Sequence, residues 1–134
     1  MITEDYVSFE IAKLLKEKGF KNSNGMLLGK SGRHYNKYET FPSKDMAIEA
    51  SIDCEEKCPL VTLQIAMKWL REVHNLFIEI MVGDYDGRRI WYDFDVINIG
   101  KKDIPIVPIY DTVELETYEE ACEAAIKYCL ENLI

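Results

Sequence analysis

The sequence predicts an α+β fold in which three main helices pack on one face of a small antiparallel sheet. Two observations lead to this prediction. Residues 62–75 carry apolar side chains at helical spacing and run directly into two segments, 76–82 and 90–96, in which apolar residues alternate. A further amphipathic stripe lies near each end of the chain. The helix and β-hairpin between Thr62 and Ile99 should therefore form the centre of the fold.

Length and composition narrow the class of protein. The chain has 134 residues, which suits one α+β domain spanning residues 1–134. Hydrophobic residues make up 48% and charged residues 30%, as is ordinary for a soluble globular protein. The formal charge of −8 disfavours nucleic acid as a partner, because phosphate contacts rely on Lys and Arg. No apolar run approaches the roughly 20 residues of a membrane span, so we expect a cytoplasmic protein with no membrane contact.

The first helix is expected to start at Thr3, whose hydroxyl can cap the first turn. Val7 and Ile11 begin its apolar stripe. Gly19 suits the left-handed position after the last turn, and Phe20 can fold back onto the helix in a Schellman motif.

The next part of the chain gives weaker patterns. Residues 22–25 form a turn cluster, and a short strand can start at 26–28. Residues 34–41 alternate weakly and are expected to form an edge strand. Ser43 can cap a short helix over 43–50, and residues 52–59 are expected to form an exposed loop.

Local signals also mark both ends of the central helix. Thr62 can cap its first turn, since a threonine hydroxyl accepts a backbone N–H there. His74 and Asn75 stand where the apolar stripe ends, and asparagine tolerates the left-handed conformation that closes a helix.

The hairpin register follows from the two apolar faces. If both faces lie on the same side, Val82 pairs with Ile90, and an odd number of loop residues separates the strands. The simplest solution is a three-residue loop over 85–87, with Gly87 at positive φ. A two-residue turn would exchange the faces and expose the apolar side chains.

This register gathers acidic residues on the opposite, outer face. Glu79 is expected across from Asp93, Asp95 lies two residues further along the same strand, and Trp91 lies across from Met81. Two carboxylates directly opposite repel each other, so solvent, a lysine, a metal or a partner should compensate. The four candidate residues for a binding surface are Glu79, Trp91, Asp93 and Asp95. The competing interpretation is a solvated outer sheet face, and a divalent cation held by the three carboxylates is the third.

Cysteine and histidine offer two further interpretations. Cys54 and Cys58, with His34 and His74, include the residue types of a zinc site, but structural zinc sites usually have closer pairs. We therefore expect loop thiols and no bound metal. His74 can act as a general base or simply occupy the helix end, and its position favours the helix end.

The C-terminal part of the chain ends in a strongly patterned helix. Residues 104–110 are apolar but contain two prolines, which indicates an edge or extended cover. Thr117 and Glu120 fit a capping box at the start of the last helix. Cys122 and Cys129 lie on its apolar side, where cysteine behaves as a small hydrophobe.

Residues 7–20, 69–75 and 118–126 resemble a family of short uncharacterised proteins of gut-bacterial genomes and their phages. The resemblance covers both ends and the central helix. It implies an accessory protein of a phage or mobile element, and it transfers no functional residue.

No motif specifies a reaction, so we predict no catalytic residue and no cofactor. The favoured hypothesis is a small non-catalytic binding or regulatory protein, with a protein partner or a second copy of the chain on the outer face. The alternatives are a small metal-dependent hydrolase or nuclease using Glu79, Asp93 and Asp95, and an acidic inhibitor of a host protein.

Overall fold

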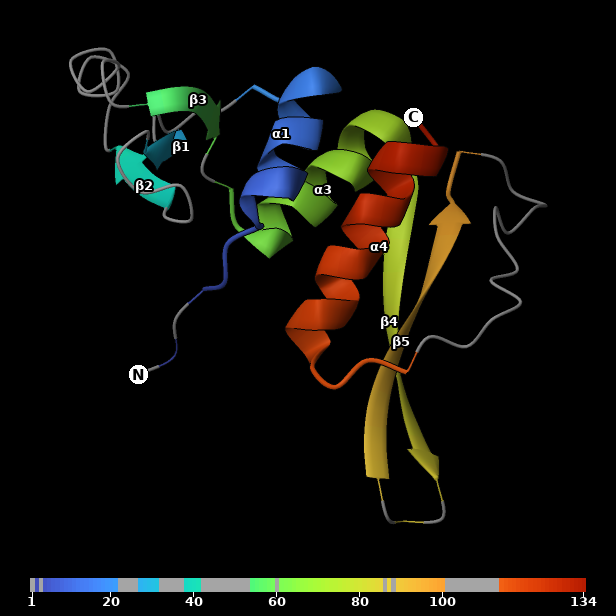
Figure 1. The fold of residues 1–134 in the computed structure, drawn as a ribbon. Coiled ribbons are helices and arrows are strands. Elements are labelled where there is room, and N and C mark those ends of the chain that lie inside the picture. The colour runs from blue at the N-terminus through green and yellow to red at the C-terminus, as the bar shows by residue number, and fades with distance from the viewer. Residues whose placement is uncertain are drawn as a thin grey trace. The chain divides into compact units, whose positions relative to one another are not determined.

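The computed structural model describes residues 2, 4–21, 27–31, 38–41, 54–59, 61–85, 87, 89–100 and 114–134. The described residues form three helices and two small antiparallel sheets, which confirms the predicted α+β class (Figure 1). The chain divides into two compact units: Tyr6–Thr62, and Met1–Asp5 together with Leu63–Ile134. The prediction that residues 1–134 form a single domain is not tested by this division and stays a prediction.

Helix α1 (Phe9–Glu17) begins later than the sequence predicts. Ser8 precedes it in extended conformation, and the Ser8 hydroxyl accepts a first-turn backbone N–H at 3.4 Å. The start at Thr3 is wrong because the intervening backbone is used elsewhere: Tyr6 forms an isolated antiparallel bridge with Thr62. A residue in a β-bridge cannot also be helical, so the helix begins only after the bridge.

The end of α1 is a Schellman motif, as predicted. Gly19 has φ +94°, and its N–H donates to the Lys16 carbonyl at 3.2 Å. The Phe20 N–H donates to the Leu15 carbonyl at 2.9 Å. These two bonds satisfy carbonyls that the helix itself leaves free.

Three strands form a sheet of order β2-β1-β3: β1 (Leu27–Ser31), β2 (Tyr38–Phe41) and β3 (Cys54–Pro59). β2 lies at an edge, as expected. The exposed loop predicted over 52–59 is wrong for residues 54–59, which form β3 and pair with β1. The predicted turn at 22–25, the helix over 43–50 and the extended segment over 104–110 lie outside the described residues.

In the other unit, α3 (Leu63–His74) starts directly after Thr62, where the sequence predicts a cap. Asn75 follows with φ +57°, which confirms the left-handed residue predicted there. The Asn75 carbonyl also accepts the N–H of Ile99 at 2.9 Å. The end of the helix is therefore joined directly to the far end of the hairpin.

Strands β4 (Leu76–Tyr85) and β5 (Arg89–Asn98) form the predicted hairpin with a register two residues from the one expected. Val82 pairs with Tyr92 instead of Ile90. An even shift leaves every side chain on its predicted face, because side chains alternate along a strand. The three residues between Tyr85 and Arg89 replace the predicted loop over 85–87, and Gly87 has the predicted positive φ, at +67°.

Helix α4 (Tyr118–Asn132) starts as predicted at Thr117, whose hydroxyl accepts the Glu120 N–H at 3.1 Å. The Glu120 carboxylate accepts the N–H of Glu116 at 3.1 Å, one residue before the position of a standard capping box. The buried side of this helix is continuous and consists of Ala121, Cys122, Ala125, Ile126, Cys129 and Leu130.

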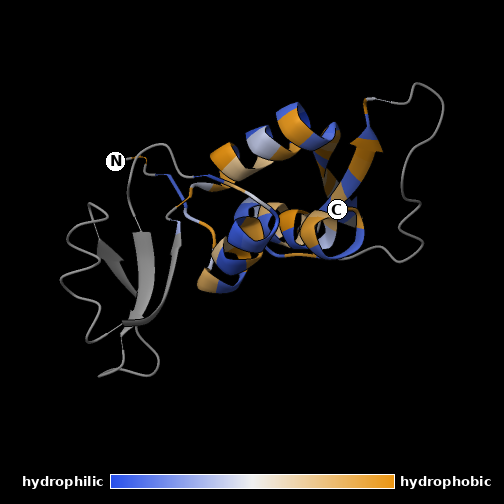
Figure 2. Ribbon diagram, turned by 90° about the horizontal axis from the view of Figure 1, so that it is seen from above, coloured by the Kyte–Doolittle hydropathy of each residue, from blue (hydrophilic) through white to orange (hydrophobic). Residues whose placement is uncertain are grey.

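Helix α4 covers the inner face of the hairpin, which is the face of the even-numbered residues (Figure 1). The rings of Tyr92 and Tyr118 meet edge to face at 6.5 Å, and those of Phe94 and Tyr128 lie 6.3 Å apart. Figure 2 shows apolar and polar residues on different sides of the helices, as expected of elements with one buried side. No helix in the described part of the chain is long and apolar enough to cross a membrane.

The left-handed Gly19 allows a direct stability test. We expect Gly19→Ala to lower the free energy of unfolding by about 1 kcal/mol, because a Cβ disfavours positive φ. Gly19→Asn should lose less, since asparagine tolerates this conformation. Urea denaturation of the full chain measures both values. Equal stability of the alanine and asparagine variants would contradict this account of the helix end.

Candidate binding surface on the hairpin

The odd-numbered residues of β4 and β5 form the outer face, which lies on the side of the hairpin away from α4. It contains all four residues that the sequence singles out. Its members with described side chains are Phe77, Glu79, Met81, Gly83, Arg89, Trp91, Asp93, Asp95 and Ile97, with the exposed Arg89 at the turn end. Phe77 and Glu79 are exposed, and Trp91, Asp95 and Ile97 are half-buried. Acidic and large apolar side chains are thus interleaved on one side of a two-stranded sheet.

Trp91 packs across Gly83, its cross-strand neighbour. A Cβ added at Gly83 would overlap the indole ring, so only glycine leaves room for it. A glycine within a strand often marks such a close approach. The sequence predicts Met81 opposite Trp91. Because the register differs by two residues, Gly83, which has no side chain, lies opposite Trp91 instead.

The indole nitrogen of Trp91 is buried and has no hydrogen-bond partner among the described residues. Packing, and not a hydrogen bond, therefore holds the ring over Gly83. A tryptophan fixed in this way loses little conformational freedom when another surface covers it, which favours contacts with a partner.

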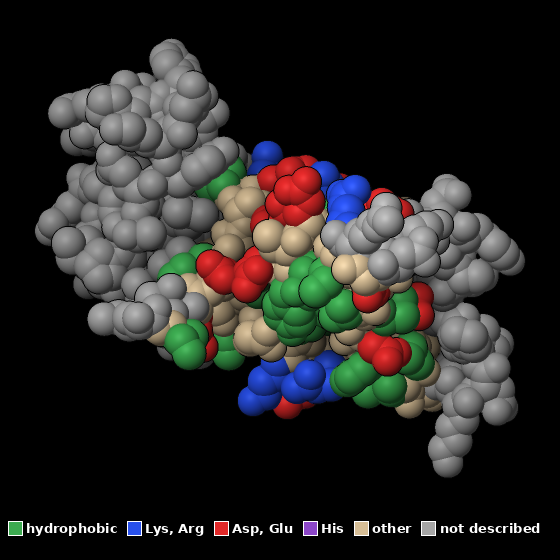
Figure 3. Space-filling model, turned by 90° about the horizontal axis from the view of Figure 1, so that it is seen from below, with side chains coloured by type: hydrophobic (Ala, Val, Ile, Leu, Met, Phe, Trp, Pro, Cys, Tyr) green, Lys and Arg blue, Asp and Glu red, His purple; other side chains and the backbone are tan. Residues whose placement is uncertain are grey.

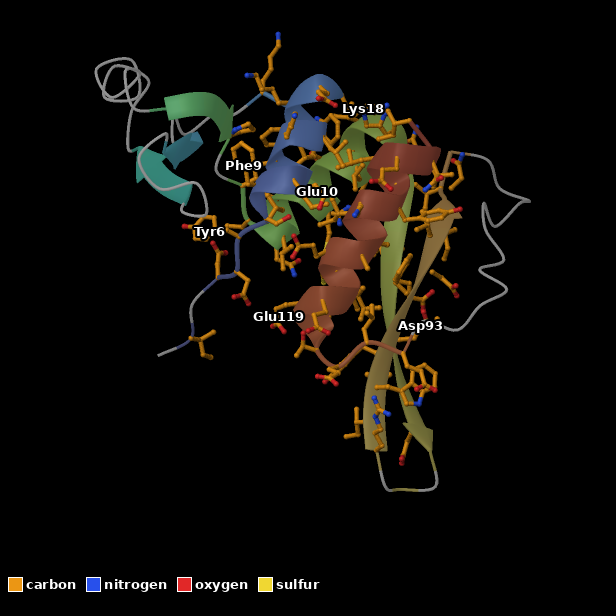
Figure 4. The ribbon with its side chains drawn as sticks, viewed as in Figure 1. Tyr6, Phe9, Glu10, Lys18, Asp93 and Glu119 are labelled. Atoms are coloured by element: carbon orange, nitrogen blue, oxygen red, sulfur yellow. The ribbon has the colours of Figure 1, made fainter. Side chains whose placement is uncertain are left out.

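The carboxylates pair differently from the prediction. Glu79 lies opposite Asp95, and Asp93 lies opposite Met81. Asp93 is 8% exposed, and its carboxylate accepts the N–H of Phe94 at 2.7 Å. Figure 4 marks Asp93 midway along the hairpin. Glu79 and Asp95 are consequently the two carboxylates of the outer face that remain accessible, and their mutual repulsion favours a positively charged neighbour.

The structure does not assemble the three acids into a metal site. Among the described residues, no group of three His, Cys, Asp or Glu side chains is placed to hold a metal ion. The zinc interpretation involving Cys54, Cys58 and His34 rests on side chains outside the described part of the chain. His74 is the last residue of α3, and its ring meets that of Trp69 edge to face at 4.6 Å.

Cys122 and Cys129 are buried free thiols, as their positions on the apolar side of the last helix predict. Burial raises the pKa of Cys129 to about 12 and also raises the pKa of Cys122. Both side chains are protonated at neutral pH. They therefore contribute to core packing and are poor nucleophiles.

The sequence missed an exposed apolar pair at the turn end of the hairpin. Val82 and Ile90 belong to the inner face and were expected to meet the helices, but they are 65% and 63% exposed. The hairpin extends past the start of α4, so its last residues have no helix to cover them (Figure 1). Figure 3 views this end of the molecule and shows hydrophobic side chains next to acidic ones.

The pairing of Leu115 with β5 is a second feature that the sequence does not predict. It forms an isolated antiparallel bridge with Tyr92, with N–H to carbonyl distances of 2.8 and 2.9 Å. This bridge occupies the outer edge of β5 at one point along the strand.

No protein-family model, curated protein or solved structure matches the chain.

The contact between Trp91 and Gly83 can be tested by a double-mutant cycle. We expect Gly83→Ala to destabilise the protein by roughly 1–3 kcal/mol, because the new methyl group displaces the indole. Trp69→Phe leaves Trp91 as the single tryptophan. In that background, Gly83→Ala should change the fluorescence emission of Trp91. Adding Trp91→Ala should remove most of the cost of Gly83→Ala. Independent, additive effects would show that the ring does not lie on the glycine.

The buried thiols predict how stability depends on pH. The folded pKa of Cys129 lies above the value of 9.0 for a free thiol, so the unfolded state loses this proton first. The stabilisation is complete below pH 9.0 and is lost as the pH rises toward about 12. One such thiol contributes a slope of up to about 1.4 kcal/mol per pH unit. Cys129→Ala should reduce this slope in urea denaturation; an unchanged slope would exclude the thiol as its source.

Proposed function

We propose that the protein is a small non-catalytic binding or regulatory accessory protein of a phage or mobile element, acting in the cytoplasm. Its proposed partner is a protein with a basic surface, contacted through the outer face of the hairpin. The resemblance to short proteins of gut bacteria and their phages supports the biological class. The composition of the outer face supports the mode of contact.

The observation that carries this proposal is the combination of Trp91, fixed over Gly83, with the accessible pair Glu79 and Asp95. Tryptophan is enriched among the residues that contribute most to protein interfaces. Opposed carboxylates repel each other in the free protein, and a lysine or arginine from a partner relieves that repulsion. The net charge of −8 acts in the same direction by steering a basic partner toward the chain.

The two alternative functions, a metal-dependent hydrolase and an acidic inhibitor of a host protein, require different arrangements of the acidic residues. A metal-dependent hydrolase needs carboxylates that converge on one point, and Glu79, Asp93 and Asp95 form no such set. Asp93 instead accepts a hydrogen bond from the backbone next to it. An acidic inhibitor of a host protein is compatible with the same surface, and the overall charge of −8 favours it. We treat inhibition as one outcome that binding to a basic partner could have.

Charge-reversal variants test the proposal by capture of proteins from a bacterial lysate. We expect Glu79→Lys combined with Asp95→Lys to reduce the amount of captured partner at least about tenfold, which corresponds to about 1.4 kcal/mol. Trp91→Ala should act in the same direction. Quantitative mass spectrometry of the captured proteins is the measurement.

The matched control is Glu17→Lys combined with Glu131→Lys, which changes the net charge equally. Both control residues are exposed in the last turn of a helix, where lysine is favourable. The control should capture the partner as the original protein does. Equal loss in the two double variants would contradict a specific role of the outer face, as would an absence of any protein captured above the empty resin.

A further inference from the structure

The bridge at Leu115 fixes the direction of the backbone groups along the whole hairpin. Both the N–H and the carbonyl of Tyr92 bond to Leu115, so they point away from β4. In an antiparallel pair, residues alternate between those that bond to the neighbouring strand and those that point outward. The paired residue Val82 must therefore point its own N–H and carbonyl outward, on the other edge of the hairpin.

A second bond gives the same assignment independently. The N–H of Ile99 donates to the carbonyl of Asn75, which places this odd-numbered pair among those that bond across the hairpin. Even-numbered residues then point outward throughout. On β4, the residues with outward backbone groups that are not buried are Ile80, Val82 and Asp84.

No described segment pairs with this edge of β4. The sheet has two strands, and the bridge to Leu115 lies on the β5 side. An open strand edge normally carries devices that prevent pairing, such as proline, a bulge, lysine or another charged side chain. β4 has no proline, lysine or bulge, and Val82 is 65% exposed. Its exposed charges, Glu79 and Asp84, are both acidic, so they disfavour an acidic strand but not a basic one. The edge is therefore able to accept another strand.

We propose that the edge of β4 over residues 79–84 binds an extended basic segment of the partner protein, which adds to the hairpin as an antiparallel strand. This inference rests on the proposed function and specifies how its partner is recognised. Strand addition obtains affinity from backbone hydrogen bonds and specificity from alternate side chains.

The register of β4 specifies the sequence of the partner segment. Read antiparallel, its first residue lies opposite Asp84 and its sixth opposite Glu79, so both should be lysine or arginine. Its third and fifth residues lie opposite Val82 and Ile80, so both should be aliphatic. The expected pattern is basic-x-aliphatic-x-aliphatic-basic, in which the second residue lies beside Gly83 and its covering indole.

Charge selects a basic segment over a second copy of the chain. Glu79 and Asp84 are exposed acids on the strand that presents the edge, and each copy carries a net charge of −8. A second β4 would bring the same acids and no compensating lysine. A basic segment instead places opposite charges next to both acids, and each such cross-strand pair is favourable.

The test uses the full chain and the capped synthetic peptide Lys-Thr-Val-Thr-Val-Lys, with binding followed by NMR of backbone amides. We expect the largest shifts at Ile80, Val82 and Asp84, whose amides point outward. The peptide Glu-Thr-Val-Thr-Val-Glu should bind at least about tenfold more weakly, because its charges are reversed. Self-association of the chain without peptide, with equal shifts at these amides, would overturn the choice of a basic partner in favour of a second copy.

Peptide methylation tests the backbone hydrogen bonds while the protein stays unchanged. N-methylation of the two valines removes the donors that face β4, and affinity should fall by about tenfold or more. N-methylation of the two threonines, whose N–H groups point away, should leave affinity within about threefold. Equal effects of the two methylations would overturn strand addition.

Two proline variants of the protein test the same backbone hydrogen bonds from the side of the hairpin. Val82→Pro removes an outward donor on the β4 edge, and Ile90→Pro removes one on the opposite edge at a residue of almost equal exposure. Binding should be lost in the first variant and kept in the second. If peptide binding depends on Trp91 but not on Val82→Pro, the edge proposal fails while the proposed function stands. If the peptide does not bind at all, the edge proposal fails, and the charge-reversal capture decides the proposed function separately.

Discussion

The pairing of β4 with β5 is the constraint on which the rest of the larger unit depends. With Val82 opposite Tyr92, even-numbered side chains lie on the side of α4 and odd-numbered ones form the outer face. The same pairing brings Trp91 over Gly83, the one position in β4 without a Cβ. A register that seats the largest side chain on the smallest residue is favoured by packing, and it also sets which backbone groups remain open at the edge of the sheet.

The hairpin is held at its open end and in its middle by neighbouring parts of the chain. Asn75 turns the end of α3 into β4 and accepts a hydrogen bond from the last turn after β5. In the middle, Leu115 bridges to Tyr92 just before α4 begins. The hairpin beyond this point has no helix over it, which leaves Val82 and Ile90 exposed. Anchoring at one end and projection at the other explain why this exposed apolar pair lies toward the turn.

The sequence predicts those features of the fold that depend on local chemistry. Gly19, Gly87 and Asn75 adopt the left-handed conformations that their residue types favour, and Thr117 caps the last helix. Alternation assigns the faces of the hairpin correctly. It cannot distinguish registers that differ by two residues, because both place the same side chains on the same face. The predicted pairing of Glu79 with Asp93 is wrong for this reason, while their common face is right.

Features that depend on distant partners were not predictable from the sequence. The start of α1 shifts to Ser8 because Tyr6 bridges to Thr62. β3 has no apolar alternation and exists as a strand through its pairing with β1. The candidate surface follows the same division: its residues were identified from alternation, but the burial of Asp93 and the free edge of β4 required the structure.

NMR contacts between α-protons test the register of the hairpin most directly. In an antiparallel pair, α-protons approach closely only at residues that do not bond across the pair, where the Cα atoms lie about 4.5 Å apart. With Val82 opposite Tyr92, we expect contacts between the α-protons of Val82 and Tyr92 and between those of Ile80 and Phe94. A contact between Val82 and Ile90 would contradict the register, and with it the position of Trp91 over Gly83. A contact between Val82 and Trp91 would exchange the faces and remove the outer surface.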